Sequence, residues 1–163
     1  LEVERNKEHK IIVTAIDTAG NSSNQIVDIY IQDPLTGQTF NLDVDGDGTV
    51  GAFSDGFMIL RKMFGDAFAD DALTNKAITS TATRTTSEIH QYIQEGIDNK
   101  ILDVDGDGEV GAFSDGFMIL RKMFGDAFEE DALTNKAITD SATRDTDEIH
   151  EYIASLTTID PIA

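Results

Sequence analysis

The first 41 residues carry hydrophobic positions at the spacing of β-strands. Residues 9–17 (HKIIVTAID) and 24–32 (NQIVDIYIQ) are rich in β-branched residues, and the second segment alternates apolar with polar positions, which favours strands. The TAGNSS segment between them has the composition of a turn. A β-hairpin is therefore predicted. Because an isolated hairpin is marginal in water, it must pack on the helical part, on another chain or on further strands, and we favour the further strands of a truncated β-sandwich domain.

From residue 42 the hydrophobic spacing becomes helical, and one segment occurs twice. Residues 42–93 and 102–153 align without a gap and differ at eight positions. Six of these differences place an acid in the second copy where the first copy has a neutral residue, whereas the glycine positions and, apart from Ala69, the apolar positions are identical. We predict a mainly α chain with three parts: residues 1–41, a first module at 42–101 and a second module at 102–163.

Each copy is predicted to hold an acidic loop, a helix, a short helical stretch and a last helix. The expected buried face of the first helix comprises Phe53, Phe57, Leu60 and Phe64. Arg61 and Lys62 are expected to point outward, and Gly65 to end the helix. In the second copy the same pattern recurs from Phe113 to Gly125.

The rest of each copy contains helix start and stop signals. The segment DALTNKAI is predicted to form two turns opened by Asp70 or Asp71. The last helix is expected to begin with a capping box, formed by Thr85 with Glu88 and by the equivalent pair in the second copy. It is expected to end at Gly96. The positions that it should bury are Ile89, Tyr92 and Ile93.

The composition restricts the function. The chain has 12 basic and 31 acidic residues, a formal charge of −19, so we expect neither nucleic acid nor an anionic membrane as a partner. It has no cysteine, so neither disulfides nor thiolate ligands can stabilise the small modules. We find no membrane-spanning run and no signal peptide, and we interpret the chain as a piece of a longer protein.

The loop that opens each copy matches a calcium-binding pattern. Asp43, Asp45 and Asp47 occupy positions 1, 3 and 5, Gly48 occupies the sharp turn, and Thr49 would offer its backbone carbonyl. Three carboxylates at this spacing would repel one another unless a cation lay between them. The equivalent residues of the second copy are Asp103, Asp105, Asp107, Gly108 and Glu109.

The acid that closes the loop is displaced by one residue. Position 12 of the pattern is Ser54, and the neighbouring Asp55 is expected to reach the ion in its place, as Asp115 is beside Ser114. We therefore predict two calcium ions, one per repeat, and magnesium suits the loops less well because it demands a tight octahedron. The alternative is that DVDGDG is a solvated acidic turn.

A calcium loop without an entering helix resembles a known module. Residues 33–42 contain Pro34 and Gly37 and cannot form that helix. The loop, its exit helix and the basic pair Arg61 and Lys62 resemble the type I dockerin repeat of bacterial secreted proteins, over residues 42–65 and 102–125. The copies differ from dockerins in their wide separation and in the extra residue before the closing acid.

The dockerin resemblance implies EF-hand-like folding, an extracellular or cell-surface location and a cohesin-like protein partner. The residues that match partner-contacting positions are Ala52, Phe53, Ser54, Arg61 and Lys62, with Ala112, Phe113, Ser114, Arg121 and Lys122 in the second copy. We favour a core role for Phe53 over partner contact. Residues 13–33 resemble the last strands of a cadherin-like or bacterial immunoglobulin-like repeat, which implies that Asp17 is a candidate interdomain calcium ligand.

Other functions fit the sequence less well. We do not expect an enzyme, because the chain has no phosphate-binding loop, no cysteine and no serine in a nucleophile-elbow setting. We interpret His90 and His150 as partly exposed helix residues rather than a zinc site, and the methionines as core filler rather than a sensor groove.

The predicted function is a calcium-stabilised module that associates with a protein partner, self-associates or acts as a spacer in a large secreted bacterial protein. The alternative is adhesion to polysaccharide through the cadherin-like domain, with the helical modules purely structural.

Overall fold

The computed structural model describes residues 8–16, 22–30 and 40–158. The chain divides into two compact units, Leu1–Thr39 and Phe40–Ala163. In the first unit, β1 (Glu8–Ile16) pairs antiparallel with β2 (Ser22–Tyr30). That these strands end a larger β-sandwich stays a prediction, and so does the role of Asp17, which lies outside the described residues.

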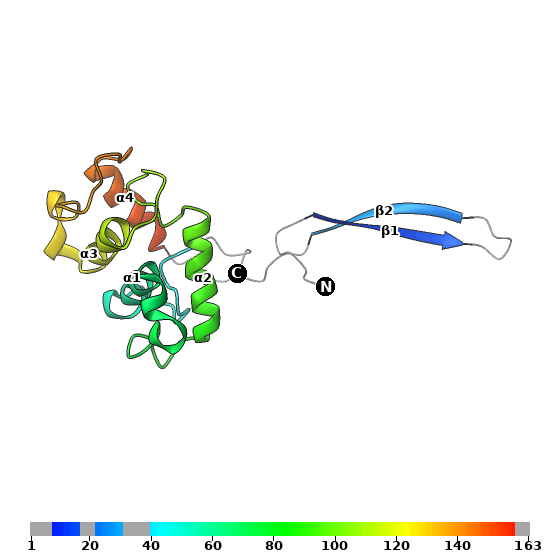
Figure 1. The fold of residues 1–163 in the computed structure, drawn as a ribbon, viewed down its shortest axis with the longest axis horizontal. Helices are drawn as coiled ribbons and strands as arrows, with labels where there is room; N and C mark the ends of the chain where they lie inside the picture. Colours follow the sequence, from blue (N-terminus) through cyan, green and yellow to red (C-terminus); the bar gives the residue numbers. More distant parts are fainter. Residues whose placement is uncertain (1–7, 17–21, 31–39, 159–163) are drawn as a thin grey trace. The chain divides into compact units, whose positions relative to one another are not determined.

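The second unit is helical and consists of two tandem repeats of the same module (Figure 1). In the first repeat, a π-helical turn (Ala52–Gly56) leads into α1 (Phe57–Met63), two 3-10 turns follow, and α2 spans Thr86–Asp98. The second repeat has the same order, with its π-helical turn at Ala112–Gly116, α3 at Phe117–Met123 and α4 at Thr146–Leu156. No helix among the described residues is long and apolar enough to cross a membrane.

The two repeats share one hydrophobic core and pack together. Its fully buried members from the first repeat are Leu42, Val44, Met58, Ile59, Leu73, Ile89 and Ile93, and the equivalent residues of the second repeat join the same cluster. The backbone N–H of Leu42 donates to the carbonyl of Leu156 at 2.8 Å. Each thin module therefore completes its core against the other copy.

The predicted buried face of the first helix was wrong at two of its four positions: Phe57 packs partly buried against the core and Leu60 is partly exposed, but Phe53 and Phe64 are exposed. Met58 and Ile59 are fully buried, whereas Phe53 is 67% exposed and Phe64 is 38% exposed. The reason lies in the π-helical turn, in which the N–H of Gly56 donates to the carbonyl five residues earlier. One extra residue in a helical turn rotates the side chains that precede it, so Phe53 leaves the face that an uninterrupted α-helix would bury.

Two predicted helix boundaries also need correction. Gly96 lies inside α2, where a Cβ atom would approach ring atoms of Phe40 to 2.7 Å. Its role is close packing, and the helix ends at Asp98, before Lys100 in the left-handed region (φ 58°). The segment DALTNKAI begins within the second 3-10 turn after α1 (Asp70–Ala72), which has no side-chain cap.

Other local predictions are confirmed. Gly65 follows α1 with a φ of +69°, as expected of a residue that ends a helix. Thr85 with Glu88, and Asp145 with Glu148, form the two expected capping boxes. The buried positions expected in the last helix of the first copy, Ile89, Tyr92 and Ile93, are buried.

Candidate metal centres

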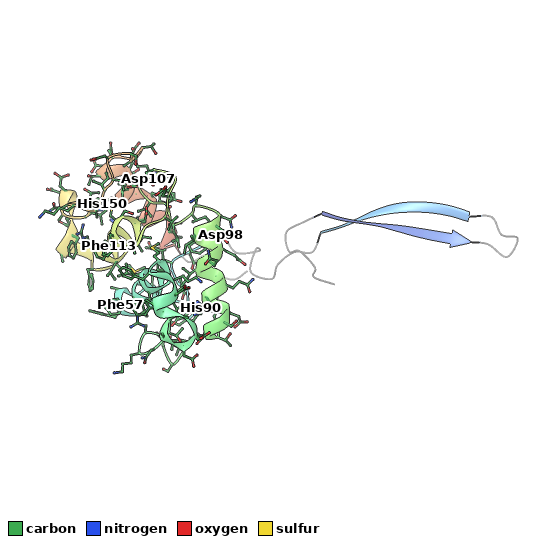
Figure 2. The ribbon with its side chains drawn as sticks, viewed as in Figure 1. Phe57, His90, Asp98, Asp107, Phe113 and His150 are labelled. Atoms are coloured by element: carbon green, nitrogen blue, oxygen red, sulfur yellow. The ribbon has the colours of Figure 1, made fainter. Side chains whose placement is uncertain are left out.

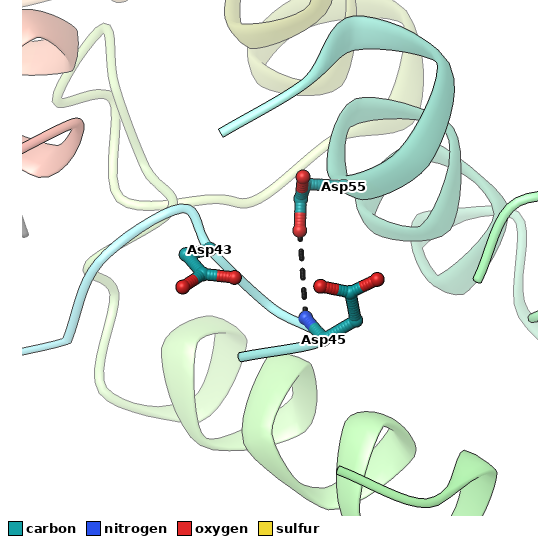
Figure 3. Close-up of side chains that lie close together, drawn as sticks. All are labelled: Asp43, Asp45 and Asp55. Carbon is teal, nitrogen blue, oxygen red and sulfur yellow. Dashed lines mark hydrogen bonds between the residues drawn. The ribbon is translucent and has the colours of Figure 1, made fainter. Parts of the chain in front are cut away.

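Three aspartate carboxylates converge in each repeat. In the first triad, Asp43, Asp45 and Asp55 each offer one oxygen atom, and these atoms lie within 4.8 Å of one another. Asp45 and Asp55 are completely buried. Figure 3 shows the arrangement, with the Asp45 N–H donating to Asp55 Oδ1 at 3.4 Å. The second triad has the same geometry and consists of Asp103, Asp105 and Asp115.

Backbone amides hold these carboxylates in place. Asp43 accepts from the N–H groups of Gly46 at 2.8 Å and Gly48 at 2.9 Å. Asp55 joins the two ends of the loop, since Oδ1 accepts from Val44 at 2.8 Å and Oδ2 from Gly51 at 2.9 Å. The loop is thus folded around oxygen atoms that face one another.

No lysine or arginine of residues 40–158 donates a hydrogen bond to a carboxylate of either triad. Within residues 40–158, every hydrogen-bond donor to the first triad is a backbone amide or a hydroxyl, never a lysine or arginine. Three buried carboxylates destabilise one another without a counter-charge. Because the donor atoms are all hard oxygens, the set fits a hard divalent cation, and each triad could hold one metal ion.

The structure separates the predicted ligands into two groups. Asp55, expected from its displaced spacing, belongs to the triad, and Ser54 donates to its Oδ2 at 2.8 Å. Asp47 lies outside the triad: its Oδ1 accepts from Thr49 N–H at 2.8 Å, and its Oδ2 accepts from Thr81 Oγ1 at 3.3 Å.

Asp107 in the second copy likewise lies outside the triad, and its Oδ2 accepts from the hydroxyl of Thr139 at 2.8 Å. Thr49 and Glu109 are exposed. That these residues and Asp47 complete the coordination of an ion stays a prediction.

A segment far along the chain closes each loop, and the sequence analysis missed it. Thr79 donates through its N–H at 3.0 Å and its hydroxyl at 2.8 Å to Asp45 Oδ2. The hydroxyl of Thr83 donates to the carbonyl of Gly46 at 2.8 Å. Arg84 donates to the carbonyl of Asp43 at 2.7 Å. We call Thr79, Thr83 and Arg84 the clasp.

The clasp has a signal within the sequence itself. Thr79, Thr83 and Arg84 are identical in the two copies, although residues 80, 81 and 85 around them differ. In the second copy, Thr139, Thr143 and Arg144 make the same bonds to the second loop. The basic side chain also stacks on an aromatic ring, with the Arg84 guanidinium carbon 4.1 Å from the Tyr92 ring centroid.

Replacing Gly46 with alanine is expected to weaken the loop more than the same change at Gly48. Both glycines have positive φ, 73° and 88°, so either alanine should cost about 1–2 kcal/mol of backbone strain. Only at Gly46 would a Cβ also collide with Thr83 of the clasp. Urea unfolding measures the free energy of unfolding of the two variants. If both substitutions lower it equally, the clasp does not restrict the conformation of the loop.

Burial changes the pKa of one carboxyl group in each triad. Desolvation raises the pKa of the Asp55 carboxyl above its ordinary value of 3.8, and hydrogen bonds from Gly51, Ser54 and Val44 only partly offset this effect. The pKa of Asp115 is raised for the same reason. The charged form of each carboxylate is therefore disfavoured in the folded protein when no cation is present.

In the metal-free protein, the contribution of Asp55 and Asp115 to the free energy of unfolding is expected to fall as the pH rises above about 4. A group whose pKa is raised by folding binds a proton more tightly in the folded state, so its stabilisation is lost as the pH rises through the folded-state pKa. Urea unfolding in chelator between about pH 4 and pH 7 tests this sign. In an Asp55→Asn, Asp115→Asn variant, the free energy of unfolding should change less with pH. An unchanged pH dependence would contradict the raised pKa values of these two carboxyls.

The histidine of each repeat bonds within its own repeat. His90 Nε2 lies 3.0 Å from the carbonyl oxygen of Asp70, and His150 Nε2 lies 3.0 Å from that of Glu130. His150 Nδ1 also lies 3.0 Å from Lys122 Nζ. The bonds to Asp70 and Glu130 tie the last helix of each repeat to its second 3-10 turn, and the bond to Lys122 ties α4 to α3.

No known protein family, curated protein or solved structure compared with the chain matches it. The two similar helical modules, each with a buried aspartate triad suggestive of a calcium loop, are consistent with dockerin-like repeats.

Proposed function

We propose that the helical unit is a calcium-binding module in which two ions, one in each repeat, stabilise the fold. The observation that carries this proposal is the pair of buried aspartate triads, whose carboxylates accept hydrogen bonds from backbone amides and hydroxyls within residues 40–158. Calcium suits them better than magnesium, because it accepts six to eight oxygen ligands in a flexible arrangement. Asp47, the Thr49 carbonyl and their equivalents would complete each set.

The ions would act chiefly on stability. A cation that binds the folded loop and not the unfolded chain adds its binding free energy to folding. The chain has no disulfide to serve this purpose. We infer a non-enzymatic role outside the cell, where calcium is plentiful and loops of this type bind it weakly.

By its resemblance to dockerins, the module would join a larger secreted protein to a cohesin-like partner. The basic pair expected to contact that partner is partly engaged within the chain: Arg61 donates to the carbonyls of Leu73 and Asn75, both at 2.9 Å. Phe53 is exposed and available for contact. Adhesion to polysaccharide stays a prediction for the domain to which the hairpin would belong.

Calorimetric titration of the chelator-treated protein with calcium tests the proposal. We expect two ions per chain and a gain of helical circular dichroism on binding. An Asp43→Ala, Asp103→Ala variant should lose both, whereas an Asp66→Asn, Asp126→Asn variant, changed at exposed acids outside the triads, should keep both. No calcium uptake by the wild-type protein would refute the proposal.

A further inference from the structure

Eight of the nine phenylalanines lie in two rows that cross from one repeat to the other. The first row is Phe57, Phe53, Phe124 and Phe128, with neighbouring ring centroids 5.4, 5.2 and 6.3 Å apart. The second row is Phe117, Phe113, Phe64 and Phe68, with centroids 5.4, 5.3 and 6.3 Å apart. We call the two rows the aromatic belt; Figure 2 labels one member from each repeat, Phe57 and Phe113.

The middle of each row is open to solvent. Phe53 is 67% exposed and Phe113 is 68% exposed, while Phe64 and Phe124 are both 38% exposed. Among the described residues, these four are most of the exposed large hydrophobic side chains; the others are Ile78 and Ile138. Exposed aromatic side chains gathered in one place are typical of a protein interface, where they contribute much of the binding energy.

The belt is held rigidly before any partner arrives. The Arg61 guanidinium lies 5.8 Å from the Phe57 ring centroid and 5.7 Å from that of Phe68, so it connects the two rows. Arg121 makes the equivalent pair of contacts. Preformed aromatic surfaces lose little conformational entropy on binding, which favours their use in recognition.

Acidic hollows lie at the far end of each row. A hollow of about 620 Å³ places Phe68 beside Asp66, Asp70 and Asp71. A second hollow of about 380 Å³ places Phe128 beside acids of its own repeat, Asp126, Glu129 and Glu130. One lysine lines each hollow, so the acids outnumber the bases in both.

These charges indicate which occupant fits. A second copy of this chain would bring a formal charge of −19 and the same acidic hollows against the belt, so like charges would oppose pairing. A partner with lysine or arginine around an apolar centre would complement both the hollows and the exposed rings.

We propose that the aromatic belt is a docking surface for a protein partner that covers Phe53 and Phe113 with apolar side chains and places basic side chains in the two acidic hollows. Each row takes rings from both repeats, so a single repeat cannot form the surface. The inference rests on the proposed function in one respect: Phe53 shares its π-helical turn with Asp55, a member of the triad.

Two amphipathic helical peptides, one of leucine and lysine and one of leucine and glutamate, serve as probes of the full chain. With calcium present, calorimetry should show binding of the lysine peptide and at least tenfold weaker binding of the glutamate peptide. A Phe53→Ser, Phe113→Ser variant should bind the lysine peptide about tenfold more weakly. The matched control, Ile78→Ser with Ile138→Ser, should bind it like the wild type. Binding should persist at about 0.5 M salt, where contact by charge alone is screened.

Several results would overturn the proposal: equal affinity in the phenylalanine variant, equal affinity for the glutamate peptide, or no binding of either peptide to the wild-type protein. Sedimentation of the wild-type protein tests self-association. A concentration-dependent dimer that the phenylalanine substitutions abolish would show that the belt binds a second copy of the chain. Calcium titration of the same variants separates the two hypotheses. If the phenylalanine variant takes up calcium normally but no longer binds the lysine peptide, the belt is supported. If the wild-type protein binds the lysine peptide but takes up no calcium, only the proposed calcium function is refuted.

Discussion

Removal of both ions is expected to lower the free energy of unfolding of the helical unit by about 5 kcal/mol. An ion present at a hundred times its dissociation constant stabilises the folded state by about 2.7 kcal/mol per site, and the chain offers two triads. Urea unfolding followed by helical circular dichroism, in calcium and then in chelator, measures the difference.

A variant that removes one charge from each triad provides the sharpest comparison. Asp45→Asn with Asp105→Asn keeps side chains of the same shape, but each neutral amide is a weaker ligand for a hard cation. This variant should gain little stability from calcium. Asp66→Asn with Asp126→Asn should respond like the wild-type protein, because these exposed acids lie outside the triads. A calcium effect below about 1 kcal/mol in the wild type would show that the fold does not depend on the ions.

Valine in place of Gly56 and Gly116 is expected to destabilise the packed repeats by about 2–6 kcal/mol in total. Overpacking a filled contact costs about 1–3 kcal/mol per site. A Cβ atom on Gly56 would lie 2.7 Å from Met123 Sδ and 2.8 Å from Leu120 Cδ1, both in the other repeat. Gly116 has the same relation to Met63 and Leu60. Urea unfolding measures the loss.

Graded and compensating variants test whether the contact between the repeats is responsible. Alanine at Gly56 should be tolerated better than valine, because the atoms it meets are the ends of flexible side chains. Combining Gly56→Val with Met123→Ala should recover part of the lost stability, since the smaller side chain makes room. If the second substitution adds its own full destabilisation, the two residues are not coupled and the predicted clash is wrong.

The aspartate triads show how much of a candidate site a local sequence pattern can predict. Asp43, Asp45 and the displaced Asp55 could be identified from spacing alone, because a loop of so few residues has few ways to bring alternate carboxylates together. The clasp could not be placed, since Thr79 lies 34 residues beyond its partner Asp45. No local rule connects such distant residues, although their identity in both copies marked them.

Local sequence was enough to predict the repeat, the acidic loops, the helix-ending Gly65 and both capping boxes, because these features depend on contacts within a few residues. The buried side of the first helix depends instead on contacts between segments that are distant in the sequence. The π-helical turn rotates Phe53 outward, Met58 is buried in the shared core, and Met123 and Leu120 of the second repeat lie against Gly56. Helical periodicity alone could not distinguish these outcomes, because both faces of that segment are apolar and only packing against the other repeat selects one of them.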